Sequence, residues 1–123
     1  MIDPLYHLEN VRQVYGGRTV LEVDRLEIEA RSIIGLIGPN GSGKSTLMRI
    51  LAFVEAPAAG RMTFQGRPRH QVDLALRRQV TMLSQEPYLL KRSVRANVAY
   101  GLEIRGTPET RSRVEEADRK SVV

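Results

Sequence analysis

The apolar positions of the chain group into short runs and one helical stretch, which together predict a mixed α/β domain. Two runs rich in Ile, Leu, Val and Met, at residues 33–37 and 80–83, are typical of buried strands of a core sheet. Residues 45–54 predict a helix, because their centre holds strong helix formers without Gly or Pro. Residues 55–60 end that helix with Pro and Gly.

Shorter elements are expected on both sides of this centre. In residues 5–15 apolar side chains recur every third position, closer to a helix, yet the β-branched and aromatic residues before the turn Gly16-Gly17 favour a strand. The remaining expected elements are strands at 19–23, 26–29 and 62–64, a turn at 65–67 and a short helix at 73–78. A further helix is expected to begin over 93–100 with Ser93 as N-cap, followed by a loop between Gly101 and Gly106 and a helix start with Pro108 in its first position.

Length and composition limit the possible classes of protein. A chain of 123 residues suffices for one modest domain with its own core. It has no cysteine, no apolar run of 18 residues, and no start typical of a signal peptide, which disfavours disulfides, zinc–thiolate sites and membrane spans. The net charge of +5 is spread along the chain rather than gathered in a basic tract, so it does not by itself indicate nucleic-acid binding.

Residues 38–45 match the phosphate-binding pattern G-x-x-x-x-G-K-[ST]. Glycines let a backbone curl with its N–H groups inward, forming a cradle for an anion. Lys44 adds a positive charge for the β- and γ-phosphates, and Ser45 offers a hydroxyl to Mg²⁺. The expected strand before this loop and helix after it are the context that the motif requires, so the sequence predicts a nucleoside triphosphate site.

Three features together resemble the ATP-binding subunit of ABC transporters. Residues 14–21 (VYGGRTVL) are similar to the family segment whose aromatic residue stacks on adenine, with Tyr15 at the matching position. The loop carries Pro39-Asn40 inside it and Thr46-Leu47 after it, as is common in the family. Residues 80–87 (VTMLSQEP) are similar to the family's glutamine-bearing loop, with Gln85 as the matching residue.

The resemblance implies an α/β fold: a partial P-loop NTPase core with an antiparallel β subdomain and the start of a helical subdomain. The expected domains are residues 1–86 for the nucleotide-binding core and 87–117 for the start of the helical subdomain. Residues 118–123 depart from the helix with which the family would continue, and we expect them to be a non-native tail.

The resemblance also implies a role for each site residue, with ATP and Mg²⁺ as ligands. Tyr15 stacks on adenine, the backbone from Asn40 to Lys44 cradles the β-phosphate, and Thr46 reaches the α-phosphate. Ser45 and Gln85 reach Mg²⁺, and Lys44 and Gln85 serve catalysis. The residues implied to bind the nucleotide are Tyr15, Gly38, Asn40, Gly41, Ser42, Gly43, Lys44, Ser45 and Thr46. Tyr15 could instead be an ordinary strand aromatic, and Gln85 a plain loop residue.

Two further stretches, residues 51–57 and 89–106, are similar to importer subunits, most of all those for tungstate or molybdate uptake. The resemblance then implies a transmembrane permease partner and a second copy of the subunit. It also implies a cytoplasmic location, peripheral on the inner face of the cell membrane, and no nucleic-acid partner. In such systems substrate choice lies in the partner subunits.

Three family motifs do not occur: Leu-Ser-Gly-Gly-Gln, an apolar strand ending in Asp-Glu, and a late switch histidine. The histidines, His7 and His70, are in the wrong positions. We therefore expect an amino-terminal half that binds ATP but hardly hydrolyses it. Two alternatives stay open at this point: a soluble ABC-class ATPase that acts on nucleic acid or ribosomes, and a non-catalytic nucleotide-binding fragment.

Overall fold

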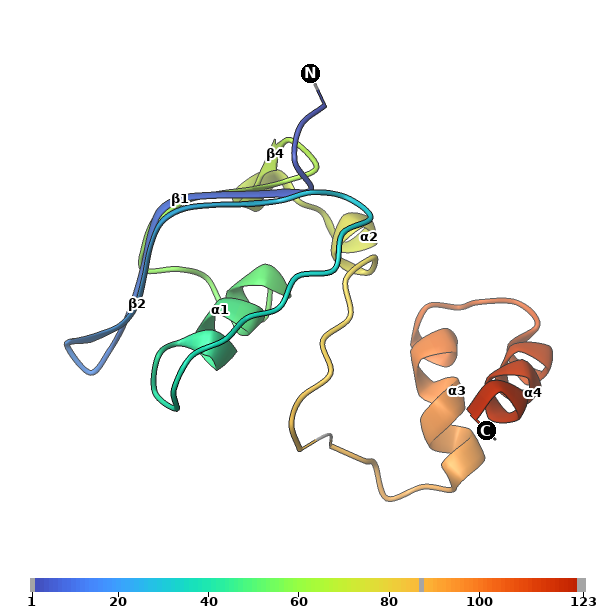
Figure 1. Cartoon of the computed structure of the whole chain (residues 1–123). Helices are drawn as coiled ribbons and strands as arrows, with labels where there is room; N and C mark the ends of the chain where they lie inside the picture. The colour runs from blue at the N-terminus through green and yellow to red at the C-terminus, as the bar shows by residue number, and fades with distance from the viewer. Residues whose placement is uncertain (1, 87, 122–123) are drawn as a thin grey trace. The chain divides into compact units, whose positions relative to one another are not determined.

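The computed structural model describes residues 2–86 and 88–121, and it divides into two compact units, Met1–Met82 and Leu83–Val123 (Figure 1). Each unit is described by itself. The expected domain boundary falls between residues 86 and 87, and the expected tail is residues 118–123. Pro87 and residues 122–123 lie outside the residues that the structure describes.

The first unit contains an antiparallel sheet in the order β2-β1-β3-β4. Its strands are β1 (Tyr6–Tyr15), β2 (Arg18–Ile28), β3 (Ala59–Phe64) and β4 (Arg67–Pro68). The predicted strand at 5–15 is confirmed, as is the turn at 65–67 that joins β3 to β4. Gly16 (φ 55°) and Gly17 (φ 75°) turn β1 into β2 with two left-handed residues, the backbone that a tight hairpin requires.

The expected separation of residues 19–23 from 26–29 is wrong, because β2 runs unbroken through Asp24 and Arg25. The pairing with β1 continues across them, with Val23 opposite Val11 and Arg25 opposite Glu9. Both residues are exposed, so a charged pair in the strand leaves no charge buried. Pairing along the whole of β1 therefore outweighs the local break that two polar residues suggested.

One face of the sheet packs on helix α1 (Lys44–Leu51), as Figure 1 shows. Leu8 and Ile50 are completely buried between sheet and helix, and Phe53 meets the ring of Phe64 edge-on at 5.5 Å between centroids. Burying a side chain of this size contributes about 1.5–3 kcal/mol. This packing holds the loop that precedes α1 against the sheet.

The predicted helix at 45–54 is confirmed, with an earlier end. Phe53 adopts a left-handed backbone (φ 61°), and the amides of Phe53 and Val54 bond to the carbonyl oxygens of Ile50 and Arg49 at 3.1 and 3.0 Å. Such a left-handed residue closes a helix. The buried position of Phe53 under the sheet stabilises this end, which the local sequence does not encode.

The two core strands expected at 33–37 and 80–83 are wrong: neither segment is a strand in the part of the chain that the structure describes. Ile33 and Ile37 are almost fully exposed and Leu83 is 83% exposed, although Val80 packs partly against the core. A strand needs a neighbour for its N–H and C=O groups. The described residues supply none to either segment.

The short helical elements follow their capping residues. The short helix predicted at 73–78 is confirmed as α2 (Leu74–Arg77), and Asp73 caps it by accepting a hydrogen bond from the Leu76 amide at 2.8 Å. A 3₁₀ helix, η1 (Arg69–Gln71), precedes α2.

In the second unit, α3 (Val94–Ile104) packs on α4 (Thr110–Ser121) through Ala99 and Val114, both buried. The predicted N-cap is confirmed, because Ser93 Oγ accepts from the Ala96 amide at 3.1 Å. The prediction of a loop starting at Gly101 is wrong, because α3 continues through that glycine. The expected position of Pro108 as the first helical residue is also wrong, because α4 begins two residues after it. No described helix is long and apolar enough to cross a membrane.

Candidate nucleotide-binding site

The glycine-rich loop makes a tight curl between residue 38 and α1. The amide of Ser42 bonds to the carbonyl oxygen of Pro39 at 3.2 Å, and Gly41 and Gly43 have φ angles of 83° and 96°. A methyl group on Gly43 would lie 2.7 Å from the carbonyl oxygen of Val20, so neither the backbone angle nor the space admits another residue there. The glycine of the motif is thus required by the fold of this loop.

Lys44 is the first residue of α1, and its side chain folds back over the loop. Its Nζ donates to the carbonyl oxygen of Pro39 at 2.7 Å, to that of Gly38, and to Ser42 Oγ at 3.3 Å. The ammonium charge therefore lies directly against the curl. An anion held by the loop's N–H groups would meet this charge.

The N-terminus of α1 faces the same place. Its first turn carries no acidic side chain, and no side chain caps it, so its free N–H groups and positive dipole end are available to an anion. Ser45 is exposed at the second helical position, whereas Thr46 is buried (6% exposed) with its Oγ1 3.4 Å from Arg49 Nη2. These positions are compatible with the roles expected for Ser45 and Thr46, which stay predictions.

The donor set suits a magnesium ion that arrives with a nucleotide. Among the described residues no group of three His, Cys, Asp or Glu side chains could hold a metal. Mg²⁺ at nucleotide sites takes most of its ligands from phosphate oxygens and water, with one or two from protein oxygens. The exposed hydroxyl of Ser45, beside the loop, fits one such protein ligand.

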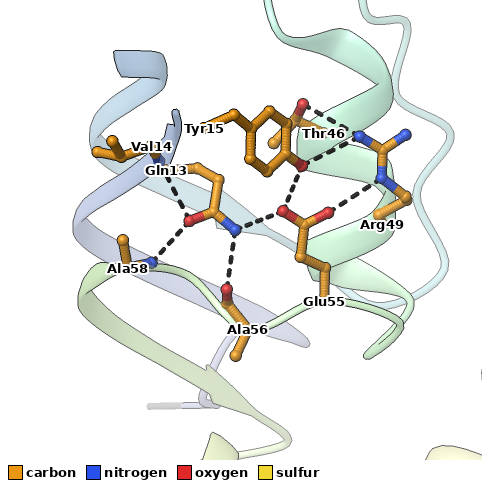
Figure 2. Close-up of polar contacts among 8 residues, drawn as sticks. All are labelled: Gln13, Val14, Tyr15, Thr46, Arg49, Glu55, Ala56 and Ala58. Carbon is orange, nitrogen blue, oxygen red and sulfur yellow. Dashed lines mark hydrogen bonds and ion pairs between the residues drawn. The ribbon is translucent and has the colours of Figure 1, made fainter. Parts of the chain in front are cut away.

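Tyr15 belongs to a polar network that links the end of β1 to α1 (Figure 2). Its hydroxyl donates to Glu55 Oε1 and accepts from Arg49 Nη2 at 3.1 Å. Arg49 Nε also donates to Glu55 Oε2 at 3.0 Å. The structure thus joins Tyr15 to the helix that follows the loop, and 42% of the tyrosine remains exposed.

Hydrogen bonds set the electrostatics of this network. They hold the pKa of the Glu55 carboxyl below its usual range, the bond from Tyr15 contributing most, before those from Arg49 and Gln13. The same contacts raise the pKa of Arg49, its bond to Tyr15 first. Glu55 is therefore an anion, and Arg49 a cation, at neutral pH.

Sequence reasoning did not find Gln13, Arg49 or Glu55. Gln13 is buried (5% exposed), and its amide bonds to Glu55, to the backbone of Ala56 and to that of Ala58. The only available signal was a glutamine in the inward register of a strand. Gln85 is exposed and belongs to the second unit, and its role stays a prediction.

The family described as ABC transporter matches residues 21–121. The chain is 42% identical over 100 residues to the tungstate uptake system ATP-binding protein TupC of Peptoclostridium acidaminophilum, covering 81% of this chain and 45% of that protein. It is 38% identical over 112 residues to the sulfate/thiosulfate import ATP-binding protein CysA of a Synechocystis strain, covering 89% and 31%.

A solved structure, that of a bacterial Atm1-family ABC exporter with ATP bound, is also similar. The TM-score is 0.72 at 30% identity, over 80% of this chain and 18% of that one. The chain spans less than half the length of these relatives. The fold is therefore a partial P-loop NTPase domain with an antiparallel β subdomain, as the sequence predicted. With a family match over most of its length, the chain belongs to the ABC transporter family.

Proposed function

We propose that this chain binds Mg·ATP through residues 38–46 and Tyr15, as part of an ATP-binding subunit that energises solute import. The observation that carries the proposal is the curl of the loop, where Gly43 lies against Val20 and the charge of Lys44 lies against the loop. The family match and the importer names of the similar proteins support it.

Each residue then has one task. The backbone N–H groups of residues 40–44 hold the β-phosphate, and Lys44 exchanges its carbonyl contacts for the β- and γ-phosphates. Ser45 offers its hydroxyl to Mg²⁺, which when bound neutralises charge on the phosphates. Thr46 contacts the α-phosphate, and the Tyr15 ring stacks on adenine.

Hydrolysis further needs a group that orients the attacking water and a charge stabiliser for the transition state. This sequence holds no Asp-Glu pair and no Leu-Ser-Gly-Gly-Gln. We therefore propose that these 123 residues bind ATP weakly and turn it over negligibly. In the assembled transporter, the ATP-binding subunit pairs with a second copy of itself and binds a transmembrane permease at the inner face of the membrane.

A titration of labelled Mg·ATP against the wild type and Lys44→Ala tests the proposal. We expect binding to be lost in the variant, with the circular dichroism spectrum unchanged, because the point charge at the loop is removed while the core is untouched. A Lys91→Ala variant, which removes a lysine of the second unit, serves as the matched control. Equal affinity of wild type and Lys44→Ala would refute the assignment of the loop.

A further inference from the structure

We propose that Glu55 and Arg49 are positioning residues that hold the Tyr15 ring in place for the base of a nucleoside triphosphate. The inference rests on the proposed function, because it assumes that Tyr15 contacts the base. It adds two residues to which the glycine-rich pattern and the adenine-stacking segment assign no role.

Tyr15 needs such support because of its place in the chain. It is the last residue of β1, followed by Gly16 and Gly17, and 42% of it is exposed. A ring in this position has little apolar packing to restrict its rotation. Its hydroxyl, however, both donates to Glu55 and accepts from Arg49 at 3.1 Å, so two bonds on opposite sides fix where the far end of the ring lies (Figure 2).

Glu55 is itself held from a second direction. The buried amide of Gln13 donates from Nε2 to Glu55 Oε1 and to the Ala56 carbonyl oxygen at 2.9 Å, while its Oε1 accepts from the Ala58 amide at 2.9 Å. The carboxylate and the segment after it are thereby tied to β1. Glu55 thus bonds at once to Gln13, Tyr15 and Arg49, which together restrict its orientation.

The Arg49–Glu55 ion pair is more buried than an ion pair on the surface of the sheet. The side chains of Arg49 and Glu55 are 35% and 20% exposed, whereas those of Arg61 and Glu9, paired at 2.6 Å on the same sheet, are 82% and 39% exposed. Exposed pairs contribute little. The Arg49–Glu55 pair is partly shielded from solvent, and both of its members bond to the Tyr15 hydroxyl. It therefore constrains that hydroxyl more strongly than a fully exposed pair would.

The network also reaches the phosphate side of the site. Arg49 Nη2, which donates to Tyr15, lies 3.4 Å from Thr46 Oγ1, the residue expected to contact the α-phosphate. One guanidinium therefore connects the base-contacting ring to the third residue of α1. A ligand with both an aromatic base and phosphates contacts two points held at a fixed separation, and pre-ordered groups lose less entropy on binding.

The experiment compares two ligands, Mg·ATP and Mg·tripolyphosphate, by titration against the 123-residue chain. We expect Glu55→Ala to weaken ATP binding about three- to tenfold, the cost of ordering a free side chain, and to leave tripolyphosphate binding unchanged. Tyr15→Phe keeps the ring and loses the hydroxyl, so it gives a similar loss, and the double variant loses no more than either alone. Glu9→Ala, which breaks the exposed pair with Arg61, is the matched control and leaves both affinities unchanged.

The Tyr15→Ala background separates positioning from a structural role. Without the ring, Glu55→Ala has no further effect on ATP binding if Glu55 acts through Tyr15. Three results would each overturn the proposal. Glu55→Ala could weaken the binding of both ligands equally, weaken ATP binding as much in the Tyr15→Ala background as in the wild type, or leave ATP affinity unchanged. If Glu55→Ala fails to fold, as thermal unfolding will reveal, Tyr15→Phe carries the test alone, because it removes a single oxygen.

Failure of the proposed function has a different signature. In that case Lys44→Ala binds ATP as tightly as the wild type. Failure of the positioning role alone leaves ATP binding dependent on Lys44 and Tyr15 but indifferent to Glu55.

Discussion

Gly43 and Val20 approach so closely that a methyl group on Gly43 would come 2.7 Å from the Val20 carbonyl oxygen. The loop before α1 is therefore seated against β2, one of the two edge strands of the described sheet. The same glycine has a left-handed backbone (φ 96°). Two independent constraints thus meet at the residue that leads into α1.

Gly43→Ala should destabilise the chain by about 1–3 kcal/mol, because a backbone contact cannot yield as a side chain can, and should abolish ATP binding. Gly41→Ala is the matched control for stability, since Gly41 is also left-handed (φ 83°) but has open space around it. Its cost should be only that of the backbone angle, about 1 kcal/mol. Urea unfolding of both variants measures the difference, and equal costs would contradict the close approach to Val20.

Tyr15→Ala should weaken binding of ATP and hardly change binding of inorganic triphosphate. Stacking of a base on an aromatic ring contributes about 1–3 kcal/mol by alanine substitution in nucleic-acid systems. Parallel titrations of the two ligands against wild type and variant measure the effect. If both ligands lose affinity equally, Tyr15 acts through the fold, which its bond to Arg49 would permit.

The pH dependence of stability should reveal the Glu55 network. Its hydrogen bonds lower the pKa of the folded carboxyl below the unfolded value of about 4.3. The stabilisation is therefore fully present above that value and disappears as pH falls through the folded pKa. We expect the stability difference between wild type and Glu55→Gln to be largest at pH 7 and to shrink below about pH 4. Urea unfolding at a series of pH values measures it, and a difference that grows in acid would contradict this assignment.

The 123-residue chain should release almost no phosphate from ATP. Loss of a positioned acid–base group typically removes about 10²–10⁴-fold in rate, and loss of a charge stabiliser supplied in trans can cost as much or more. Phosphate release by the wild type should equal that of Lys44→Ala. Steady turnover that depends on Lys44 would show that these residues already form a competent enzyme.

Residues 33–37 should make the chain prone to associate, because Ile33 and Ile37 are almost fully exposed in a segment without a strand partner among the described residues. Ile33→Lys should shift elution in size-exclusion chromatography toward the monomer. Thr19→Lys adds the same charge at an exposed position of β2 and should not. A monodisperse monomer in the wild type would contradict the expectation.

The local elements were determined by the sequence itself. The hairpin at Gly16 and Gly17, the caps Asp73 and Ser93, and the glycine-rich loop follow from backbone angles and hydrogen bonds within a few residues of each other. Such interactions depend little on the rest of the fold, so a pattern of residue types predicts them.

Only the tertiary structure determined those features that depend on contacts between residues far apart in the sequence. Residues 33–37 have the composition of a core strand, yet a strand forms only where another strand offers hydrogen bonds, and the described residues offer none there. Conversely, Asp24 and Arg25 lie inside β2 because β1 pairs along its length. The network of Tyr15, Arg49 and Glu55 joins three separate segments whose residue types are unremarkable alone. Only folding brings them within hydrogen-bond distance, because the burial of Leu8 and Ile50 fixes α1 against the sheet.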